Sequence, residues 1–409
     1  MGGMMRLAPA AAALITLVAC RQRAEAVQTR STVEDLVRQT MPAVEQAVGL
    51  KFKRQPGVEI RTRDQIRSYV LHKLDEDMPP REFASYEAAY KHLGLIPDSV
   101  DLHRLLVNVL TEQVAGYYDP DSGALFIPTD ADTAMLRTTV ISHELVHALQ
   151  DQYSPIDSVI RPRHQNDRRS AAEAIFEGQA TLGQIRVLMP EQKIENLPSL
   201  WDMGGAVQMQ QEQFPTFSHA PLWVKQTLIF PYLAGGDFVK WFITQHPDEQ
   251  PYGKLMPVST SQILHPERYA AHDAPVRVAF DPADHPGLTD DLGEFETRLV
   301  LQQTLDSAEQ AAALASGWAG DRYAEFGAQG EALVWYVVWR SPDAASGFAA
   351  WLTKGWAHRV EPGRTWRVDR LSLDGRPATV VVDASVGWAG WKHLPTAHIA
   401  SAAGASAPN

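Results

Sequence analysis

The segment Ser142-His143-Glu144-Leu145-Val146-His147-Ala148-Leu149-Gln150-Asp151 decides the fold, because it carries two imidazoles and a carboxylate at helical spacing. Residues four apart lie on the same face of a helix, so His143 and His147 can direct ring nitrogens at one metal ion. Glu144 lies about 100° further round the helix, where it can take a proton from a metal-bound water. The segment therefore predicts a zinc-binding helix with two ligands and a general base.

The residues around this segment predict a long, largely buried helix over about residues 132–152. Apolar side chains recur at spacings of three and four, and neither proline nor glycine interrupts them: Met135, Leu136, Val140, Ile141, Leu145, Val146 and Leu149. Any short motif can arise by chance. Two imidazoles and a carboxylate inside an apolar helix would be costly without a partner, however, so the pattern favours a metal site.

A third ligand is expected from a second helix, over Ser170–Ala180, and Glu177 is the predicted ligand. Glu177 follows His147 by 30 positions, and the polar residues 161–169 leave room for the chain to turn and return. Gly178 removes a side chain where two helices and a metal must crowd together. Glu173 is the alternative ligand; Glu173 or Asp151 could instead orient an imidazole, and a solvated glutamate explains Glu173 equally well.

The sequence His-Glu-Leu-Val-His-Ala-Leu-Gln-Asp, followed by Glu177-Gly178-Gln179-Ala180, resembles the gluzincin group of zinc metallopeptidases, which includes thermolysin-like and bacterial collagenase-like enzymes. The resemblance covers roughly residues 110–190. It implies that His143, His147 and Glu177 are zinc ligands and that the chain hydrolyses peptide bonds. The substrate cannot be carried over from this resemblance.

The N-terminus predicts export and a lipid anchor. Residues 1–19 contain Arg6 and then an apolar run too short for an ordinary membrane span, which is typical of a secretory signal. The run ends Leu17-Val18-Ala19-Cys20, which resembles the lipobox of bacterial lipoproteins, and Cys20 is the only cysteine. An ordinary signal peptide that contains a cysteine is the alternative. We expect an extracytoplasmic, lipid-anchored protein of the cell envelope, attached through Cys20.

Charge and length bound the remaining possibilities. The chain of 409 residues has 37 basic and 49 acidic residues, and 45% of its residues are hydrophobic. Loss of residues 1–19 would take the net charge from −12 to about −13, so nucleic acid is not an expected partner. The expected partner is a peptide or protein substrate, and the oligomeric state does not follow from the sequence.

The expected fold class is α+β and mainly helical, with a zincin-like catalytic core and a small C-terminal α+β domain. The expected parts are a signal peptide (1–19), a tether (20–32), a helical region (33–112), a zincin-like metallopeptidase domain (113–281), a linker (282–293), the C-terminal domain (294–400) and a tail (401–409). Helices are expected over 33–48, 63–77, 82–92, 101–112, 294–305, 308–315 and 344–352. Strands are expected over 58–61, 332–339 and 378–382, with a turn over 317–322.

Residues 113–128 predict a β-hairpin, because two β-prone runs flank a turn rich in Asp, Pro and Gly. In peptidases with the His-Glu-x-x-His motif, a strand before the zinc helix commonly pairs with an extended substrate. That resemblance implies that one strand of this hairpin binds substrate by β-augmentation. A hairpin that only covers the zinc helix is the alternative.

A donor for the oxyanion of the tetrahedral intermediate is also expected. The polar segment 259–269 follows a long apolar and aromatic stretch, and its His265 and Tyr269 are the predicted donors. Tyr232 and His219 are the alternatives. Tyr232 lies in an expected helix over 222–244, which Pro231 should kink.

These features predict a membrane-tethered zinc metallopeptidase in which zinc and Glu144 activate water. A proteolytically idle zinc-binding lipoprotein, acting as a chaperone or assembly factor for envelope proteins, is the first alternative, and the presence of Glu144 argues against it. The second is a lipoprotein whose helices merely pack, and the third is an aminopeptidase rather than an endopeptidase.

Overall fold

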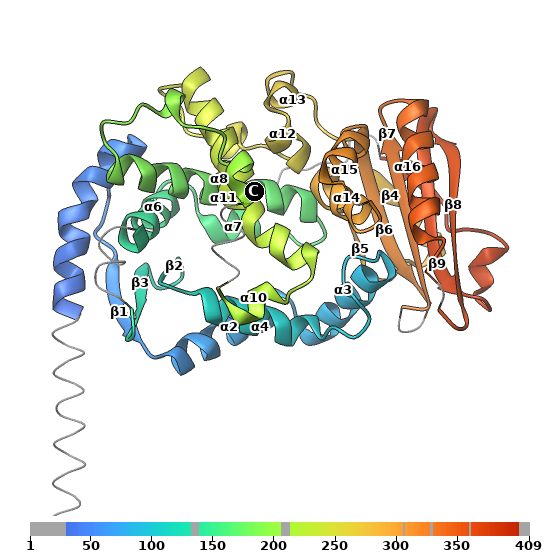
Figure 1. Ribbon diagram of the computed structural model, residues 1–409, viewed down its shortest axis with the longest axis horizontal. Helices are drawn as coiled ribbons and strands as arrows, with labels where there is room; N and C mark the ends of the chain where they lie inside the picture. The colour runs from blue at the N-terminus through green and yellow to red at the C-terminus, as the bar shows by residue number, and fades with distance from the viewer. Residues whose placement is uncertain are drawn as a thin grey trace, which may run out of the picture.

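The computed structural model describes residues 30–131, 139–205, 213–305, 307–327, 330–359 and 361–400. These residues form many helices together with three β-sheets, which confirms the predicted α+β class. Figure 1 shows a mainly helical part on the left and, on the right, the largest sheet, which has the strand order β5-β6-β7-β9-β8. The predicted signal segment, Cys20 and the tail lie outside the described residues. Among the helices described, none has the length and apolar character needed to span a bilayer.

The N-terminal region consists largely of helices, and their described bounds lie within three residues of the predicted ones. The chain is helical over residues 30–48 and continues through β1 (Gly57–Arg61), α2 (Arg63–Asp77), α3 (Pro80–His92) and α4 (Leu102–Gln113). Thr62 caps α2 with a capping box, and Asp101 caps α4 by accepting a hydrogen bond from Arg104 N–H. Local sequence signals therefore set these helix starts.

The predicted hairpin over 113–128 is present as β2 (Tyr117–Asp119) and β3 (Ala124–Pro128), which pair antiparallel. Strand β1 pairs with β3 in parallel, so the sheet order is β1-β3-β2 and β2 lies at an edge. All five residues of the central strand β3 are buried. This small sheet lies beside α6, as Figure 1 shows.

The central part is built on three helices: α6 (Ile141–Asp151), α8 (Asn166–Leu188) and α11 (Leu222–Gln245). The described part of the predicted 132–152 helix begins at residue 139, since residues 132–138 lie outside the description. Pro231 lies inside α11, as expected. Shorter helices complete this part: α7 (Ile156–Ile160), η2 (Ile194–Asn196), η3 (Trp201–Met203), α10 (Pro215–Ser218), η4 (Gly253–Leu255), α12 (Thr260–Leu264) and α13 (Pro266–Ala270).

The C-terminal part is an antiparallel sheet in the order β5-β6-β7-β9-β8. Its elements are β4 (Val278–Phe280), η5 (Pro282–Asp284), β5 (Thr289–Asp290), α14 (Gly293–Gln302), α15 (Ala308–Ala315), β6 (Trp318–Phe326), β7 (Ala332–Trp339), α16 (Pro342–Trp356), β8 (Arg364–Leu373), β9 (Arg376–Ser385), η6 (Ala389–Trp391) and β10 (Ala397–Ile399). Alternate residues of β7 belong to separate clusters: Trp335 packs with α14 and α16, whereas Val334 packs with β4. The sheet is therefore covered on both faces.

Two predictions for this part are corrected. Residues 317–322, predicted to be a turn, contain the first residues of β6; the strand bulges at Gly320, where a Cβ atom would lie 2.3 Å from the carbonyl oxygen of Val276. Residues 282–293, predicted to be a linker, form η5, β5 and the start of α14. Asp290 and Asp291 accept hydrogen bonds from the backbone N–H groups of Asn166 and Asp167, which joins this segment to the start of α8.

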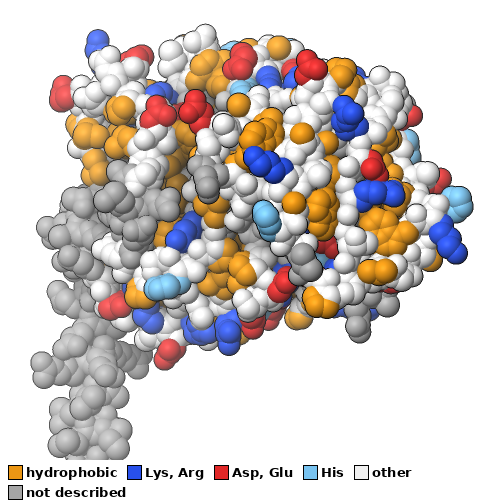
Figure 2. Space-filling model, turned by 45° about the vertical axis from the view of Figure 1, so that its right-hand side comes forward, with side chains coloured by type: hydrophobic (Ala, Val, Ile, Leu, Met, Phe, Trp, Pro, Cys, Tyr) orange, Lys and Arg blue, Asp and Glu red, His pale blue; other side chains and the backbone are white. Residues whose placement is uncertain are grey.

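The surface carries charges of both signs. On the face that Figure 2 shows, acidic and basic side chains are interspersed among scattered apolar ones. No continuous basic area is visible on that face outside the grey atoms.

Candidate metal centre

His143 and His147 lie one turn apart on α6, on the side of the helix that meets α8. Each side chain is 14% exposed, and their ring centroids are 4.8 Å apart with the planes at 79°. Another side of α6 is apolar: Ile141 and Leu145 are fully buried in a cluster that includes Val37 of the helix over residues 30–48. Packing of that apolar side fixes the orientation in which α6 presents the two imidazoles.

Glu177 of α8 completes a group of three possible ligands, called here the metal group (His143, His147 and Glu177). Its Oε2 atom lies 3.1 Å from Nε2 of His143 and 3.4 Å from Nε2 of His147, and the two ring nitrogens are 3.2 Å apart. Tetrahedral coordination with zinc–ligand distances of about 2.0–2.1 Å requires ligand atoms about 3.3–3.4 Å apart. The three atoms therefore have the mutual spacing that one zinc ion needs. They form the one such group found among the described residues.

Close contact between α8 and α11 sets the position of Glu177. A Cβ atom on Gly178 would lie 2.2 Å from the carbonyl carbon of Gly235, and one on Gly235 would lie 2.0 Å from the carbonyl oxygen of Ala174. Side chains at these positions would push the helices apart. The crowding predicted at Gly178 is therefore present, and the partner is the backbone of α11.

The metal group has strongly shifted proton affinities. Burial disfavours a charged ring at His147, but the charges of Glu177 and Glu144 and the hydrogen bonds to Glu177 and Gln150 together outweigh burial and raise the pKa of His147 to about 9. Burial alone would raise the pKa of Glu177, yet the charges and hydrogen bonds of His147 and His143 hold that pKa far below its usual range. Protons therefore compete with a metal ion for His147, whereas Glu177 stays ionised.

Glu144 lies next to the metal group on α6 and is held by the hairpin. The backbone N–H of Tyr118, in β2, donates to Oε2 of Glu144 at 2.8 Å. Burial raises the pKa of the Glu144 carboxyl, while the two imidazoles and this hydrogen bond act in the opposite direction. Glu144 is 8% exposed, so it is shielded from bulk water but remains ionisable.

Asp151 and Glu173 do not orient the imidazoles. Asp151 accepts a hydrogen bond at 3.0 Å from the hydroxyl of Tyr118, so it helps to fix the hairpin beside α6. Glu173 pairs with Arg169 one turn earlier on α8, at 3.8 Å, and its side chain is 40% exposed. The alternative ligand is thus engaged elsewhere, and Glu177 alone of the two carboxylates faces both rings.

Tyr232 is the predicted alternative donor that the structure brings to the metal group. Its ring stacks on His143, with centroids 5.9 Å apart and planes at 21°. The charge of Glu177, together with burial, raises the pKa of Tyr232 well above 10, so the hydroxyl keeps its proton. His219, the other alternative donor, is engaged elsewhere: its ring hydrogen-bonds the carbonyl of Pro215 at the start of α10.

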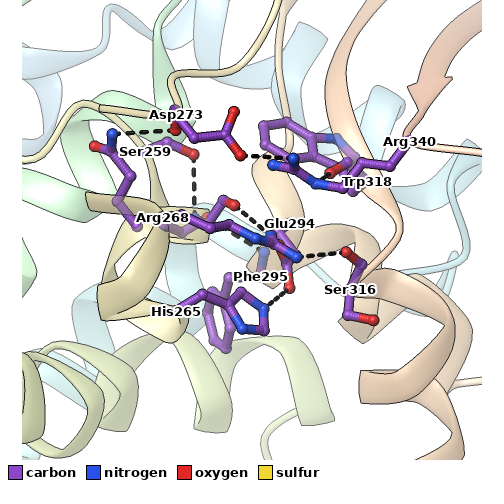
Figure 3. Close-up of polar contacts among 12 residues, drawn as sticks. Ser259, His265, Arg268, Asp273, Glu294, Phe295, Ser316, Trp318 and Arg340 are labelled. Carbon is purple, nitrogen blue, oxygen red and sulfur yellow. Dashed lines mark hydrogen bonds and ion pairs between the residues drawn. The ribbon is translucent and has the colours of Figure 1, made fainter. Parts of the chain in front are cut away.

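His265 and Tyr269 are held in other contacts, which corrects their prediction as donors at this site. His265 Nε2 lies 2.6 Å from Oε1 of Glu294, which also pairs with Arg268. Figure 3 shows these three side chains, called here the Glu294 cluster, pointing toward one another between α12, α13 and α14. Tyr269 donates to the carbonyl of Leu255 at 2.8 Å. Neither residue contacts the metal group among the interactions of the described residues.

Gln150 is the contact that the sequence interpretation missed. Its Oε1 atom lies 2.8 Å from Nδ1 of His147, and the residue is fully buried. The available signal was a glutamine three positions after His147, on the same face of an apolar helix. A buried amide at such a position needs partners, and the metal ligand is one of them.

Comparison with known proteins identifies only the C-terminal part. A family model described as a domain of unknown function (DUF8575) matches residues 284–391. No curated protein and no solved structure matches the chain. The matched range covers the five-stranded sheet with α14, α15 and α16, and it does not include the metal group.

Proposed function

We propose that the protein is a zinc metallopeptidase of the gluzincin type, in which His143, His147 and Glu177 hold one zinc ion. The proposal is carried by one observation: three ligand atoms from two helices lie 3.1–3.4 Å apart, the spacing of tetrahedral coordination. Three protein ligands leave a fourth position for water or substrate, as in catalytic rather than structural zinc sites.

The charges around the metal group also favour a cation. Glu177 and Glu144 are both carboxylates, and an imidazole must be neutral to act as a ligand. In the described part of the chain, the ion-pair partners of Glu177 are the two imidazoles, and Glu144 accepts a neutral backbone N–H. A divalent ion would offset both carboxylates, where neutral imidazoles alone would leave them uncompensated.

Each neighbouring residue then has a chemical role. Zinc, when bound, supplies a water of lowered pKa and polarises the substrate carbonyl. Glu144 would serve as the general base and then as the general acid beside such a water, and burial, which raises the pKa of its carboxyl, suits a group that must take up and release a proton. Tyr232 keeps its proton and donates a hydrogen bond to the oxyanion that develops at the carbonyl.

The position of β2 suggests how a peptide would bind. β2 is an edge strand, and its residue Tyr118 contacts Glu144 directly. An extended peptide that pairs with this edge would run beside the general base, with its backbone held by main-chain hydrogen bonds. The substrate is therefore proposed to be an extended segment of a peptide or protein.

We also propose that the protein works outside the cytoplasm, anchored by lipid at Cys20. This part rests on the signal-like residues 1–19 and the sequence Leu17-Val18-Ala19-Cys20 alone. Stable anchoring needs more than one acyl chain, which lipoprotein modification provides. Its test is membrane fractionation of cells that express Cys20→Ser; retention of that variant in the membrane under mild washing, after signal cleavage, would contradict the anchor.

The activity is tested by incubating the purified chain with a peptide library and identifying the products. We expect Glu144→Gln to retain zinc and to lose hydrolysis by about 10²–10⁴-fold, because the substitution removes the general base and keeps its shape. Glu173→Gln is the matched control: this half-buried carboxylate on α8 pairs with Arg169, and the variant should cleave like the parent. Equal cleavage by Glu144→Gln would refute the proposed role of Glu144. A parent that binds zinc and cleaves nothing would favour the idle zinc-binding lipoprotein.

A further inference from the structure

A buried chain of amide side chains begins at the metal ligand His147. Gln150, on the same helix, has no exposed surface, and its Oε1 lies 2.8 Å from Nδ1 of His147. An uncharged polar side chain is costly in such a place unless every polar atom has a partner. The partners of Gln150 therefore reveal what it does.

The neighbours of Gln150 fix the orientation of its amide. Nε2 donates to the backbone carbonyl of Phe176 at 2.8 Å and to Oε1 of Gln179 at 3.1 Å. A flipped amide would place its oxygen against the carbonyl oxygen of Phe176, where no hydrogen bond is possible. Because Oε1 is the acceptor, His147 must carry its proton on Nδ1, and Nε2 of His147 is left facing the metal group.

The chain continues through two further glutamines. Gln179, 5% exposed, donates from Nε2 to Oε1 of Gln250 at 2.7 Å, and Gln250 donates to the carbonyl of Val48 at 3.1 Å. The hydroxyl of Tyr252 donates to Oε1 of Gln179. The chain thus joins α6, α8, the segment after α11 and the end of the helix over residues 30–48.

We propose that Gln150 is the positioning residue of His147, and that Gln179 and Gln250 hold Gln150 in its acceptor orientation. The inference rests on the proposed zinc site. It assigns the residue that keeps the ligand His147 in the tautomer with its proton on Nδ1. An amide does this without adding negative charge beside Glu144 and Glu177, whereas a carboxylate would bring a third. The amide thus orients the ring and leaves the charge of the site to the ligands.

The test measures zinc affinity by chelator competition and compares three variants. Gln150→Leu removes the acceptor and should weaken zinc binding about 10–100-fold, the usual effect of losing a partner of a ligand. Gln150→Glu keeps an acceptor for the Nδ1 proton and should bind zinc more tightly than Gln150→Leu. The control is Gln303→Leu, since the side chain of Gln303 donates to the carbonyl of Leu95 and has no interaction with the metal group among the described residues; its zinc affinity should equal that of the parent.

Two further measurements separate positioning from stability. In the zinc-loaded parent, NMR should show a slowly exchanging Nδ1 proton on His147, and Gln150→Leu should lose this signal. If Gln150→Leu does not fold, Gln179→Leu replaces it, because Gln179 does not touch His147; the expected loss of zinc affinity is roughly three- to tenfold.

The possible outcomes distinguish this inference from the proposed function. Zinc affinity of Gln150→Leu within twofold of the parent would overturn the positioning role, even if the parent cleaves peptides. A parent that binds zinc with the predicted variant effects and cleaves no peptide would support the positioning role and overturn the peptidase. A parent that binds no zinc would overturn both.

Discussion

The metal group and the Glu294 cluster contain the same kinds of side chain and differ in what offsets their charge. In the Glu294 cluster, the buried carboxylate accepts from His265 and from Arg268, whose guanidinium also bonds Ser261 and the carbonyl of Ser316 (Figure 3). In the metal group, Glu177 faces two imidazoles whose ligand nitrogens converge on the same point. One cluster has a permanent cation built in, and the other does not.

This difference shows how a structural cluster can be separated from a candidate metal site. Arginine stays charged at any ordinary pH and fills the space between the groups that it joins, so the Glu294 cluster is complete. Imidazoles can give up their protons and turn lone pairs toward a shared point. A His/Glu group without an arginine or lysine therefore has space for a metal ion, and its carboxylate has a negative charge that the ion can offset.

Among the variants that test the difference between the metal group and the Glu294 cluster, Glu294→Gln is expected to have the largest effect, which is on the free energy of unfolding. Removing one partner of a buried ion pair leaves Arg268 uncompensated and should lower the free energy of unfolding by about 3–5 kcal/mol, while zinc affinity stays unchanged. Chemical denaturation with saturating zinc measures the loss. Glu267→Gln is the control, because Glu267 also pairs with His265 but its side chain is 75% exposed; its effect should stay below about 1 kcal/mol. A large loss of zinc affinity in Glu294→Gln would break the distinction between the two regions.

Next in size is the effect of Tyr232→Phe on peptide hydrolysis. The substitution keeps the ring that stacks on His143 and removes the hydroxyl, so kcat should fall about 10²–10³-fold if that hydroxyl stabilises the oxyanion. Tyr269→Phe is the matched control, since its hydroxyl donates to the carbonyl of Leu255 and, among the described residues, does not contact the metal group; it should leave kcat unchanged. If Tyr269→Phe loses as much activity as Tyr232→Phe, the assignment from geometry fails.

The smallest effect, taken per pH unit, is the change of zinc affinity with pH. It arises because the cationic side chain of the metal group is a titratable histidine, whereas the Glu294 cluster contains an arginine. Zinc binding must displace the proton of His147, whose pKa is about 9, so zinc affinity should rise about tenfold per pH unit from pH 6.5 to 9. In zinc-stripped protein, the stability of the fold should instead fall as the pH rises. The raised pKa of His147 stabilises the fold fully below pH 6.5, and this contribution is lost as the pH rises through 9. A zinc affinity that is constant over this range, measured by chelator competition, would contradict the proton competition.

Much of the metal group could be predicted because its signals are local. The spacing of His143 and His147 places both rings on one face of a helix, and Gly178 beside Glu177 marks a close helix crossing. The hairpin followed from its turn residues. These features depend on residues near one another in the sequence. The helical spacing and the turn residues were therefore sufficient to predict them.

The features that the sequence did not predict depend on contacts between distant segments. Tyr232 and Tyr269 both follow apolar stretches, and only the crossing of α8 with α11 brings Tyr232 to the metal group. Strand β8 was also not predicted, although the exposure of its residues alternates as in a half-buried edge strand. Asp290 looked like part of a linker, although it binds the start of α8, 124 positions earlier. Such pairings have no local signal.

The zinc content of the purified protein tests the central claim most directly. After dialysis against zinc-free buffer, elemental analysis should find about one zinc per chain in the parent and in Glu294→Gln, because the metal group is the one set of three ligands at such spacing among the described residues. Glu177→Ala removes one of those ligands and should retain far less than one. A parent without zinc, or a Glu177→Ala variant that keeps a full equivalent, would contradict the assignment of the metal group.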